Sequence, residues 1–315
     1  MWGRCRPKDL HKALSLVQPS ATVPGLRADT TSGGPDFRPA RTRPGSPPPG
    51  IYARRDRVVH DGPVPLRDRV GPGPSEYLDE LVQRAENVVS DRLVGIWLVG
   101  SAALGDFEPH RSDLDVQAIA AETLPEGALT RLAADLAHES LPCPARGLEF
   151  VLYSRVGLLD PEGPAFQLNF NTGASMSRHL GLDPWAEPRF WFVIDVAIAR
   201  ERAVPLVGPP AEAAWPELPR SMVAGALGEA LAWYASSDSS RAQAFLAACR
   251  AWAWAVDGVW RSKRDAAEWA RGRIADALVD VALASRDRAS APQLDAASLA
   301  AVLELTQAAL DEAAA

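Results

Sequence analysis

Residues 94–120 read VGIWLVGSAALGDFEPHRSDLDVQAIA, and this stretch decides the fold of the chain. Ile96 to Val99 form an unbroken apolar run, which is typical of a strand buried on both faces. The Gly100-Ser101 pair then predicts a sharp turn into a short helix, because glycine permits a tight turn and close approach to a ligand. Residues 112–116, SDLDV, predict a second strand.

Two aspartates occupy alternate positions of this second predicted strand. Asp113 and Asp115 therefore point to one face of the sheet. Two such carboxylates repel each other unless a cation lies between them, and Mg²⁺ prefers hard oxygen ligands of this kind, often shared with phosphates. The Ser101 hydroxyl and nearby N–H groups suit phosphate oxygens. The alternative interpretation is an ordinary Gly-Ser turn followed by two solvated aspartates.

The ordered pattern G-S, ten residues, S-D-x-D resembles the nucleotidyltransferase superfamily, whose members transfer a nucleotide from a nucleoside triphosphate and release pyrophosphate. Residues 147–153, GLEFVLY, alternate as a strand does, with Glu149 near the start. This superfamily carries its third carboxylate at that place. The resemblance therefore implies that Asp113, Asp115 and Glu149 are the catalytic and magnesium-binding group. A merely solvated Glu149 is the alternative.

The composition is typical of a soluble globular protein. The chain has 315 residues, enough for one large or two medium domains, with 23% charged and 47% hydrophobic residues. It contains neither an apolar run of about 18 residues nor a secretory signal, and we expect a cytoplasmic location without a membrane span. Its three cysteines have no metal-binding spacing, so they predict reduced thiols.

Charge and proline divide the chain near residue 74. Residues 1–74 hold 13 of the 27 prolines and 13 Lys/Arg against 6 Asp/Glu, which leaves 20 Lys/Arg against 34 Asp/Glu in the remainder. A stretch such as RPARTRPGSPPPG (38–50) cannot build an apolar face, so we predict a disordered extension over 1–74. A nucleic-acid-binding tail is the less favoured alternative. The acidic remainder argues against nucleic acid and favours a cationic small molecule.

The remaining pattern predicts two domains. A helical stripe begins at Ser75, and further elements are a helix over 128–140, a strand over 166–170 and a helix over 188–202, before VGPP (207–210) breaks the pattern. From Pro219 onward no strand signal remains, and we predict four helices, at 220–236, 241–260, 263–286 and 294–313.

One predicted helix start carries chemical information. Ser262 followed by Asp265 resembles a capping box, which places Lys263 in the first turn beside the positive end of the helix dipole. A cation is unfavourable there unless an anion such as a triphosphate binds nearby, so Lys263 is a candidate phosphate ligand. An exposed lysine that is merely tolerated is the alternative.

From Ser75 to Arg286 the chain resembles the streptomycin/spectinomycin adenylyltransferases. This resemblance implies an α/β (α+β) nucleotidyltransferase domain with a mixed sheet, over 75–207, followed by an all-α helical bundle over 208–315. It also implies that Arg250 and Lys263, thirteen residues apart, contact the ATP phosphates. The shared features are Gly100-Ser101, Ser112-Asp113-Leu114-Asp115, Leu148-Glu149, the Gly208-Pro209-Pro210-Ala211-Glu212 hinge, CRAWAW and DGVWRSKRDAAEWA.

The chain departs from this family in the acceptor half. The place of the family's antibiotic-packing tryptophan reads Asn171-Thr172-Gly173-Ala174. The family's acidic and amide residues before the arginine are replaced by Ser236, Ser240 and Gln243, with Asp238 near, and its tyrosine after Arg286 is Ala289. We therefore expect spectinomycin to be a better acceptor than the larger streptomycin.

The resemblance implies a magnesium-dependent adenylyltransferase that transfers AMP from ATP to a hydroxyl of a small cationic polyol, such as an aminoglycoside, and could confer antibiotic resistance. The nucleotide site would comprise Gly100, Ser101, Ser112, Arg250 and Lys263. We expect no nucleic-acid or membrane partner, and a monomer is favoured. A non-catalytic nucleotide sensor or interaction module is one alternative, and a toxin-type enzyme that adenylylates protein is another.

Overall fold

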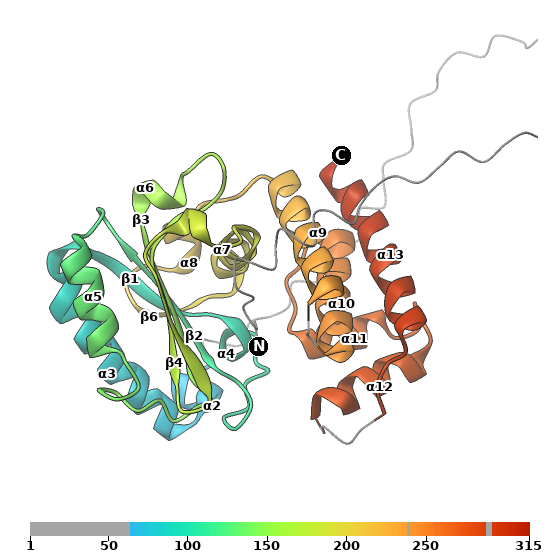
Figure 1. Ribbon diagram of the computed structural model, residues 1–315, viewed down its shortest axis with the longest axis horizontal. Helices are drawn as coiled ribbons and strands as arrows, with labels where there is room; N and C mark the ends of the chain where they lie inside the picture. Colours follow the sequence, from blue (N-terminus) through green and yellow to red (C-terminus); the bar gives the residue numbers. More distant parts are fainter. Residues whose placement is uncertain (1–63, 238–239, 288–291) are drawn as a thin grey trace, which may run out of the picture.

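A six-stranded sheet with the strand order β5-β4-β3-β2-β1-β6 forms the N-terminal part of the protein (Figure 1). The computed structural model describes residues 64–237, 240–287 and 292–315. The strands are β1 (Leu93–Leu98), β2 (Leu114–Ala120), β3 (Leu148–Ser154), β4 (Phe166–Gly173), β5 (Met176–Gly181) and β6 (Val204–Val207).

The sheet is mixed, as predicted. Strands β2 and β3 are parallel, and the other neighbouring pairs are antiparallel. A parallel pair needs a crossover connection, which α5 (Glu126–Asp135) supplies between β2 and β3. β5 and β6 were not expected from the sequence. β5 is largely exposed at one edge and β6 has four residues at the other, so neither carries the apolar signal of a central strand.

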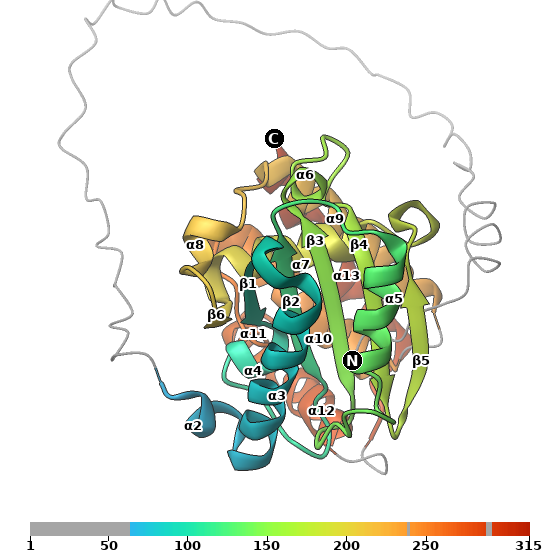
Figure 2. The same ribbon diagram turned by 90° about the vertical axis from the view of Figure 1, so that its left-hand side faces the viewer.

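Helices cover both faces of the sheet (Figure 2). α3 (Pro72–Val89) and α5 pack on one face, where β2 contributes Leu114 and Val116 to the apolar core. α7 (Phe190–Arg202) packs on the opposite face against Val99, Ile119 and other apolar side chains. Because side chains alternate along a strand, Asp115 and Gln117 lie on the same face as Ile119, toward α7.

The C-terminal part consists of helices around a third apolar core, which also includes side chains of α7. Its helices α9, α10 and α13 overlap the ranges expected from sequence. Two short helices stand where one was predicted over 263–286, and this prediction was wrong: the chain turns at residues 271–275, with Gly272 at a φ of +78°. The helices are α9 (Arg220–Ser236), α10 (Arg241–Asp257), α11 (Lys263–Ala270), α12 (Asp276–Asp287) and α13 (Ala296–Ala314).

Three short helices and two 3-10 turns lie between the main elements of the described chain. α4 (Gly100–Ala103) follows β1, α6 (Arg155–Leu158) follows β3, and α8 (Ala211–Ala214) follows β6. Two 3-10 turns occupy Ser90–Arg92 and Pro184–Ala186. The helix expected over 128–140 is observed as α5, which is shorter and lies earlier in the chain. It begins at Glu126 because Pro125 is its N-terminal cap.

Ordered structure begins before Ser75, which corrects the expected boundary. α2 (Leu66–Val70) precedes α3, and α3 begins at Pro72, a residue type suited to the first helical turn. Val70 is 2% exposed within the apolar core, and Arg69 Nη1 donates a hydrogen bond to the Ala103 carbonyl at 3.3 Å. The prediction for residues 1–63 lies outside the described residues, whereas 64–74 join the fold.

The structure bears on the expected lack of a membrane span and on the expected reduced thiols. Within the described ranges, none of the helices combines the length and apolar character required to cross a membrane. Cys143 and Cys249 are buried free thiols, and burial raises the pKa of Cys143 to about 11. Cys5 lies outside the described residues.

Two truncations should differ in stability. Removal of residues 1–74 should lower the melting temperature relative to removal of 1–63, because only the longer truncation deletes the buried side chains of α2 and of the first turn of α3. The loss of Val70 alone removes about 1–3 kcal/mol of apolar burial. Differential scanning calorimetry of both proteins measures the difference. Equal melting temperatures would show that α2 contributes nothing to folding.

Candidate active site

The turn after β1 brings the backbone against a carboxylate. Gly100 has a φ of +62°, and a Cβ placed there would lie 1.8 Å from Asp115 Oδ2. Glycine is therefore required at this position for both its backbone conformation and its missing side chain. Next to it, Ser101 Oγ is buried and has no hydrogen-bond partner among the described residues. A donor-acceptor hydroxyl in this state suits a bound polar ligand.

The three predicted carboxylates converge at one end of the parallel strand pair. Asp115 of β2 is directly paired with Glu149 of β3, and Asp113 precedes β2 by one residue. Burial raises the pKa of Asp115 well above its usual value, and the charges of Asp113 and Glu149 raise it further. The three carboxylates therefore disfavour one another's charged forms. One buried oxygen, Asp113 Oδ2, has no hydrogen-bond partner in the described part of the chain.

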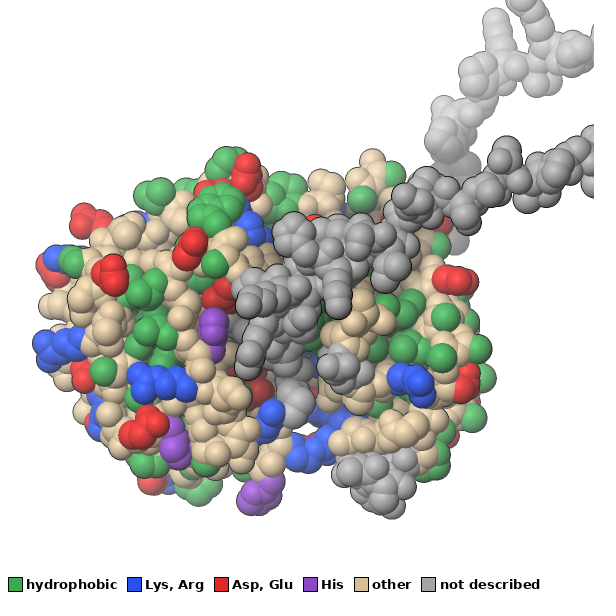
Figure 3. Space-filling view, in the orientation of Figure 1, with side chains coloured by type: hydrophobic (Ala, Val, Ile, Leu, Met, Phe, Trp, Pro, Cys, Tyr) green, Lys and Arg blue, Asp and Glu red, His purple; other side chains and the backbone are tan. Residues whose placement is uncertain are grey.

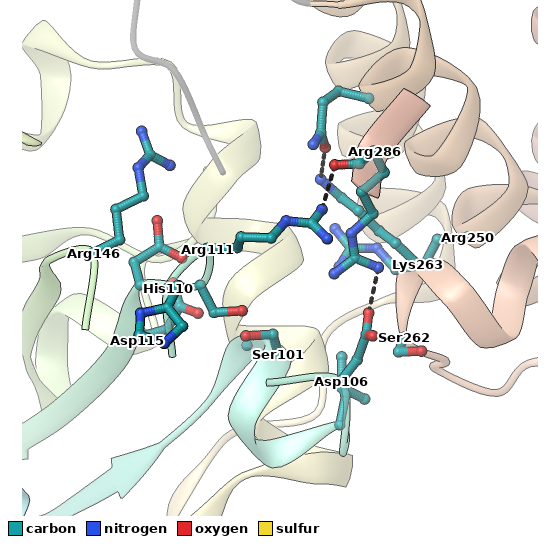
Figure 4. Close-up of a pocket in the computed structure, with 15 residues that line it drawn as sticks. Ser101, Asp106, His110, Arg111, Asp115, Arg146, Arg250, Ser262, Lys263 and Arg286 are labelled. Carbon is teal, nitrogen blue, oxygen red and sulfur yellow. Dashed lines mark hydrogen bonds and ion pairs between the residues drawn. The ribbon is translucent and has the colours of Figure 1, made fainter. Parts of the chain in front are cut away.

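Cations face this cluster from the helical part across a cavity of about 350 Å³ (Figure 4). Arg250 comes from α10, Lys263 from the start of α11 and Arg286 from α12. The space-filling view shows Lys and Arg side chains gathered between the two parts of the molecule (Figure 3). The lining from the sheet side includes Gly100, Ser101, Asp106, His110, Arg111, Ser112, Asp113, Asp115 and Arg146.

Lys263 is a cleft residue rather than an exposed, tolerated lysine. Ser262 caps α11 by accepting a hydrogen bond from the Asp265 N–H at 3.0 Å, as the sequence predicts. Lys263 Nζ donates to Gln243 Oε1 at 2.9 Å. Burial, together with the positive charges of Arg250 and Arg286, lowers the pKa of Lys263 to about 7. Arg250 is 8% exposed, and burial lowers its pKa as well. Both cations would gain from a bound anion.

An ion-pair network that the sequence analysis missed joins the two parts beside this cavity. Asp106, in the loop after α4, accepts from Arg286 Nη1 at 2.7 Å and from Arg264 Nε at 3.3 Å. The side chains of Asp106 and Arg286 are only 9% and 11% exposed. Ser112 Oγ accepts from the Glu108 N–H at 3.0 Å, so this serine shapes the same loop. The partners are more than 150 positions apart, and no local sequence signal connects them.

A fourth carboxylate near the cluster was also missed. Asp195 projects from α7, and its charge raises the pKa of Asp115 and that of Tyr234. In the sequence it stands within the apolar stretch FWFVIDVAIA, where periodicity indicates a core helix. The charged residue inside that stretch was the signal that could have identified it.

The positions at which the sequence departs from the streptomycin/spectinomycin adenylyltransferases lie in different parts of the structure. Asn171 pairs with Glu149 across β3 and β4 and is 5% exposed, so it lies beside the carboxylates. Ser240 caps α10 by accepting from the Gln243 N–H at 3.3 Å, and Ser236 Oγ donates to its own helix. The predictions for Asp238 and Ala289 lie outside the described residues.

The donor set fits a magnesium ion that is shared with a ligand. No group of three or more His, Cys, Asp or Glu side chains in the described ranges is arranged to hold a metal ion by itself. Mg²⁺ usually takes one or two carboxylates and completes its shell with water and substrate phosphates. Such a pair is available in Asp113, whose Oδ2 atom has no hydrogen-bond partner among the described residues, and Asp115, whose raised pKa a nearby cation would lower.

The chain is similar to proteins named adenylyltransferases. No protein-family model matches the chain. Aminoglycoside (3'') (9) adenylyltransferases from Klebsiella pneumoniae and Escherichia coli are each 29% identical over 229 residues, which cover 70% of this chain and 87% of each relative. A spectinomycin adenyltransferase from Enterococcus faecialis, solved with ATP and spectinomycin, has a TM-score of 0.56 and 14% identity, and the match covers 75% of this chain and 99% of that one.

These comparisons confirm three expectations. The chain resembles the aminoglycoside adenylyltransferases, and it is an enzyme of the nucleotidyltransferase class. The fold class is confirmed as a mixed sheet with a helical C-terminal part.

Two glycine substitutions should distinguish the effect of a clash with Asp115 from the effect of backbone strain alone. Gly100 and Gly105 both have positive φ, at +62° and +76°, but nothing lies within 4 Å of a Cβ at Gly105. Each alanine substitution should cost about 1–2 kcal/mol of stability for the left-handed backbone. Only Gly100→Ala should also displace Asp115 and abolish MgATP binding, measured by titration calorimetry. Normal MgATP binding by Gly100→Ala would refute the proposed role of this contact.

Proposed function

We propose that this enzyme transfers AMP from ATP to a hydroxyl group of an aminoglycoside or a similar cationic polyol. The observation that carries the proposal is the opposition of two charged groups across one cavity. Asp113 and Asp115 line this cavity on the sheet side, with Glu149 paired beside Asp115, and Arg250 and Lys263 line it on the helical side. A triphosphate with its metal ion is complementary to both groups at once.

The nucleotide phosphates would lie between Ser101 and the two cations. Arg250 and Lys263 are partly stripped of water, so an anion would restore the charge stabilisation that burial removes. The Ser101 hydroxyl would supply a hydrogen bond to a phosphate oxygen. Gly100 lets the backbone approach, and Ser112 fixes the loop that borders the cavity.

Asp113 and Asp115, with Glu149 beside them, would hold Mg²⁺. When bound, this ion would neutralise phosphate charge and polarise the phosphoryl group that is attacked. No other ligands within the described chain are needed if ATP oxygens and water complete the shell.

Glu149 would act as the general base. Its carboxylate would take the proton from the acceptor hydroxyl as that oxygen attacks the α-phosphorus in line. The new oxygen–phosphorus bond forms while the bond to the β-phosphate oxygen breaks, and pyrophosphate leaves with the bonding electrons. Arg250 and Lys263 would stabilise the charge that develops on the departing group.

Glu149 favours an enzyme over a binding module that only senses nucleotide. A nucleotide sensor has no need of a base, whereas Glu149 is paired with Asp115 and is 8% exposed beside the cavity. A protein acceptor is the other alternative, and mass analysis of the enzyme and of added proteins after incubation with ATP would detect it.

The acceptor that we favour is spectinomycin rather than streptomycin. At the place where the resembling family carries a tryptophan, Asn171 lies next to Glu149, and an amide cannot provide the same aromatic stacking surface. Ser236 and Ser240 bear no charge for a guanidinium group, and each hydrogen-bonds to its own helix. A larger guanidinium-bearing acceptor would lose contacts worth about 1–3 kcal/mol for each missing polar pair.

Direct detection of the product tests the proposal. The protein, ATP and Mg²⁺ are incubated with spectinomycin, streptomycin and a panel of aminoglycosides, and mass spectrometry records the gain of one AMP. We expect an adduct on spectinomycin and pyrophosphate in equal amount. No adduct on any cationic polyol would refute the proposed acceptor class.

Substitution of the carboxylates should stop the reaction without unfolding the protein. Asp113→Asn, Asp115→Asn and Glu149→Gln keep the shape of each side chain but remove its charge, so each should reduce transfer by about a hundredfold or more. Glu187→Gln is the matched control, because Glu187 bonds Asn169 and His179 on the same sheet rather than lining the cavity. Near-normal transfer by any of the three removes that residue from the mechanism.

Nucleotide binding should take up a proton at Lys263. With a pKa of about 7, Lys263 is largely neutral at pH 8, and a bound triphosphate should restore its positive charge. Affinity for MgATP should therefore fall as the pH rises above 7. Calorimetry at pH 8 in two buffers of different ionisation enthalpy measures the uptake, which Lys263→Met should abolish. Identical uptake by Lys263→Met would assign the proton to another group.

A further inference from the structure

A second, smaller cavity lies next to the nucleotide cavity and shares Gly100, Asp115 and Arg250 with it. Its volume is about 30 Å³, which is enough for one water-sized group but not for a sugar ring or a phosphate. It is therefore a place for a single substituent of a larger ligand. Its further lining comes from the residue after β1 and from β2, β3 and α7, and it includes Val99, Gln117, Glu149, Val151, Asp195 and Ile198.

The lining of this small cavity accepts hydrogen bonds. Gln117 is 3% exposed, and its Oε1 atom is buried without a hydrogen-bond partner among the described residues. An unsatisfied buried carbonyl oxygen costs free energy that a bound N–H or O–H group would recover. Asn169 carries another buried Oδ1 atom in the same state on the same face, aligned with Gln117 through Val151.

Charge in the cavity favours a cation. Three carboxylates, from Asp115, Glu149 and Asp195, face it, against the single guanidinium of Arg250. That guanidinium also faces the nucleotide cavity and is surrounded by Tyr234, Asp195 and Asp115. The apolar side chains of Val99, Val151 and Ile198 exclude water and strengthen each polar contact that a ligand makes there.

We propose that this small cavity binds an ammonium group of the acceptor, with the Asp195 carboxylate and the Gln117 amide oxygen as its specificity-determining ligands. This inference rests on the proposed function, because it names the part of the acceptor that the enzyme recognises. Glu149 borders the same cavity, so the ammonium group anchors the acceptor while its hydroxyl approaches the base. A neutral polyol of the same size would be a poor substrate.

A structural role for Asp195 makes a different prediction. If its carboxylate only held Arg250 in place, loss of its charge would weaken MgATP binding and leave the acceptor unaffected. As an acceptor ligand, it affects the acceptor KM and leaves the affinity for MgATP unchanged. Asp195→Asn and Gln117→Met approximately preserve side-chain volume. The first removes the negative charge of one ligand of the ammonium group, and the second removes the oxygen of the other.

The first measurement needs no catalysis. Thermal unfolding of the wild-type protein is followed with millimolar 2-deoxystreptamine, a diaminocyclitol, and with myo-inositol, a cyclitol without amines, at matched ionic strength. We expect 2-deoxystreptamine alone to raise the melting temperature, in the wild type and in the Glu187→Gln control. Asp195→Asn and Gln117→Met should lose that shift. Stabilisation by myo-inositol to the same extent, or a shift that survives Asp195→Asn, overturns the proposal.

The second measurement uses transfer to spectinomycin. Asp195→Asn should raise the KM for spectinomycin about tenfold or more, which corresponds to the loss of one charged hydrogen bond, with the Kd for MgATP unchanged. A raised Kd for MgATP with an unchanged KM overturns the proposal in favour of a role in positioning Arg250. The two failures are distinguishable. If no acceptor receives AMP but the 2-deoxystreptamine shift still depends on Asp195, the proposed function fails and the ammonium site stands.

Discussion

The site depends on two sets of like charges that face each other across a cavity. Asp113 and Asp115 repel each other on the sheet, and Arg250 and Lys263 repel each other on the helices. Buried like charges are unfavourable, and their pKa values shift toward the neutral forms. A triphosphate with its metal ion would neutralise both groups, because the metal would offset the carboxylates and the phosphates would offset Arg250 and Lys263. The affinity of such a site would therefore depend on pH and on the metal.

Two kinds of contact hold this arrangement in place. Within the sheet domain, the missing side chain of Gly100 lets the turn lie against Asp115, so the site is built around one glycine. Between the two parts, the ion pairs of Asp106 with Arg286 and Arg264 fix the loop after α4 to the bundle. The pair of Asp106 with Arg286 is well buried, and the cost of desolvating both charges means that such a pair adds little to stability. The same network presents Arg286 to the nucleotide cavity.

The sheet face beneath α7 has a polar part and an apolar part. Near Asp115 and Glu149 it is polar, and the amide oxygens of Gln117 and Asn169 have no hydrogen-bond partner within the described ranges. Further along the strands this face is apolar and packs on Phe192. Buried polar atoms without partners are unfavourable, so their concentration next to a cavity indicates ligand binding rather than packing.

The central elements, and the strand positions that bring the three carboxylates together, were readable from the sequence alone. Local signals were sufficient there, because apolar runs, a Gly-Ser turn and alternate aspartates act over a few residues. The same holds for Lys263, whose helix cap was readable from Ser262 and Asp265. Only the tertiary structure decided what depends on distant partners. The salt bridges of Asp106 and the packing of helix α2 each depend on contacts that no local pattern encodes. The charge of Asp195 stands out within its apolar helix, but only the folded protein shows that this carboxylate lies beside Asp115 and Glu149. The edge strands β5 and β6 gain their pairing only from the finished sheet.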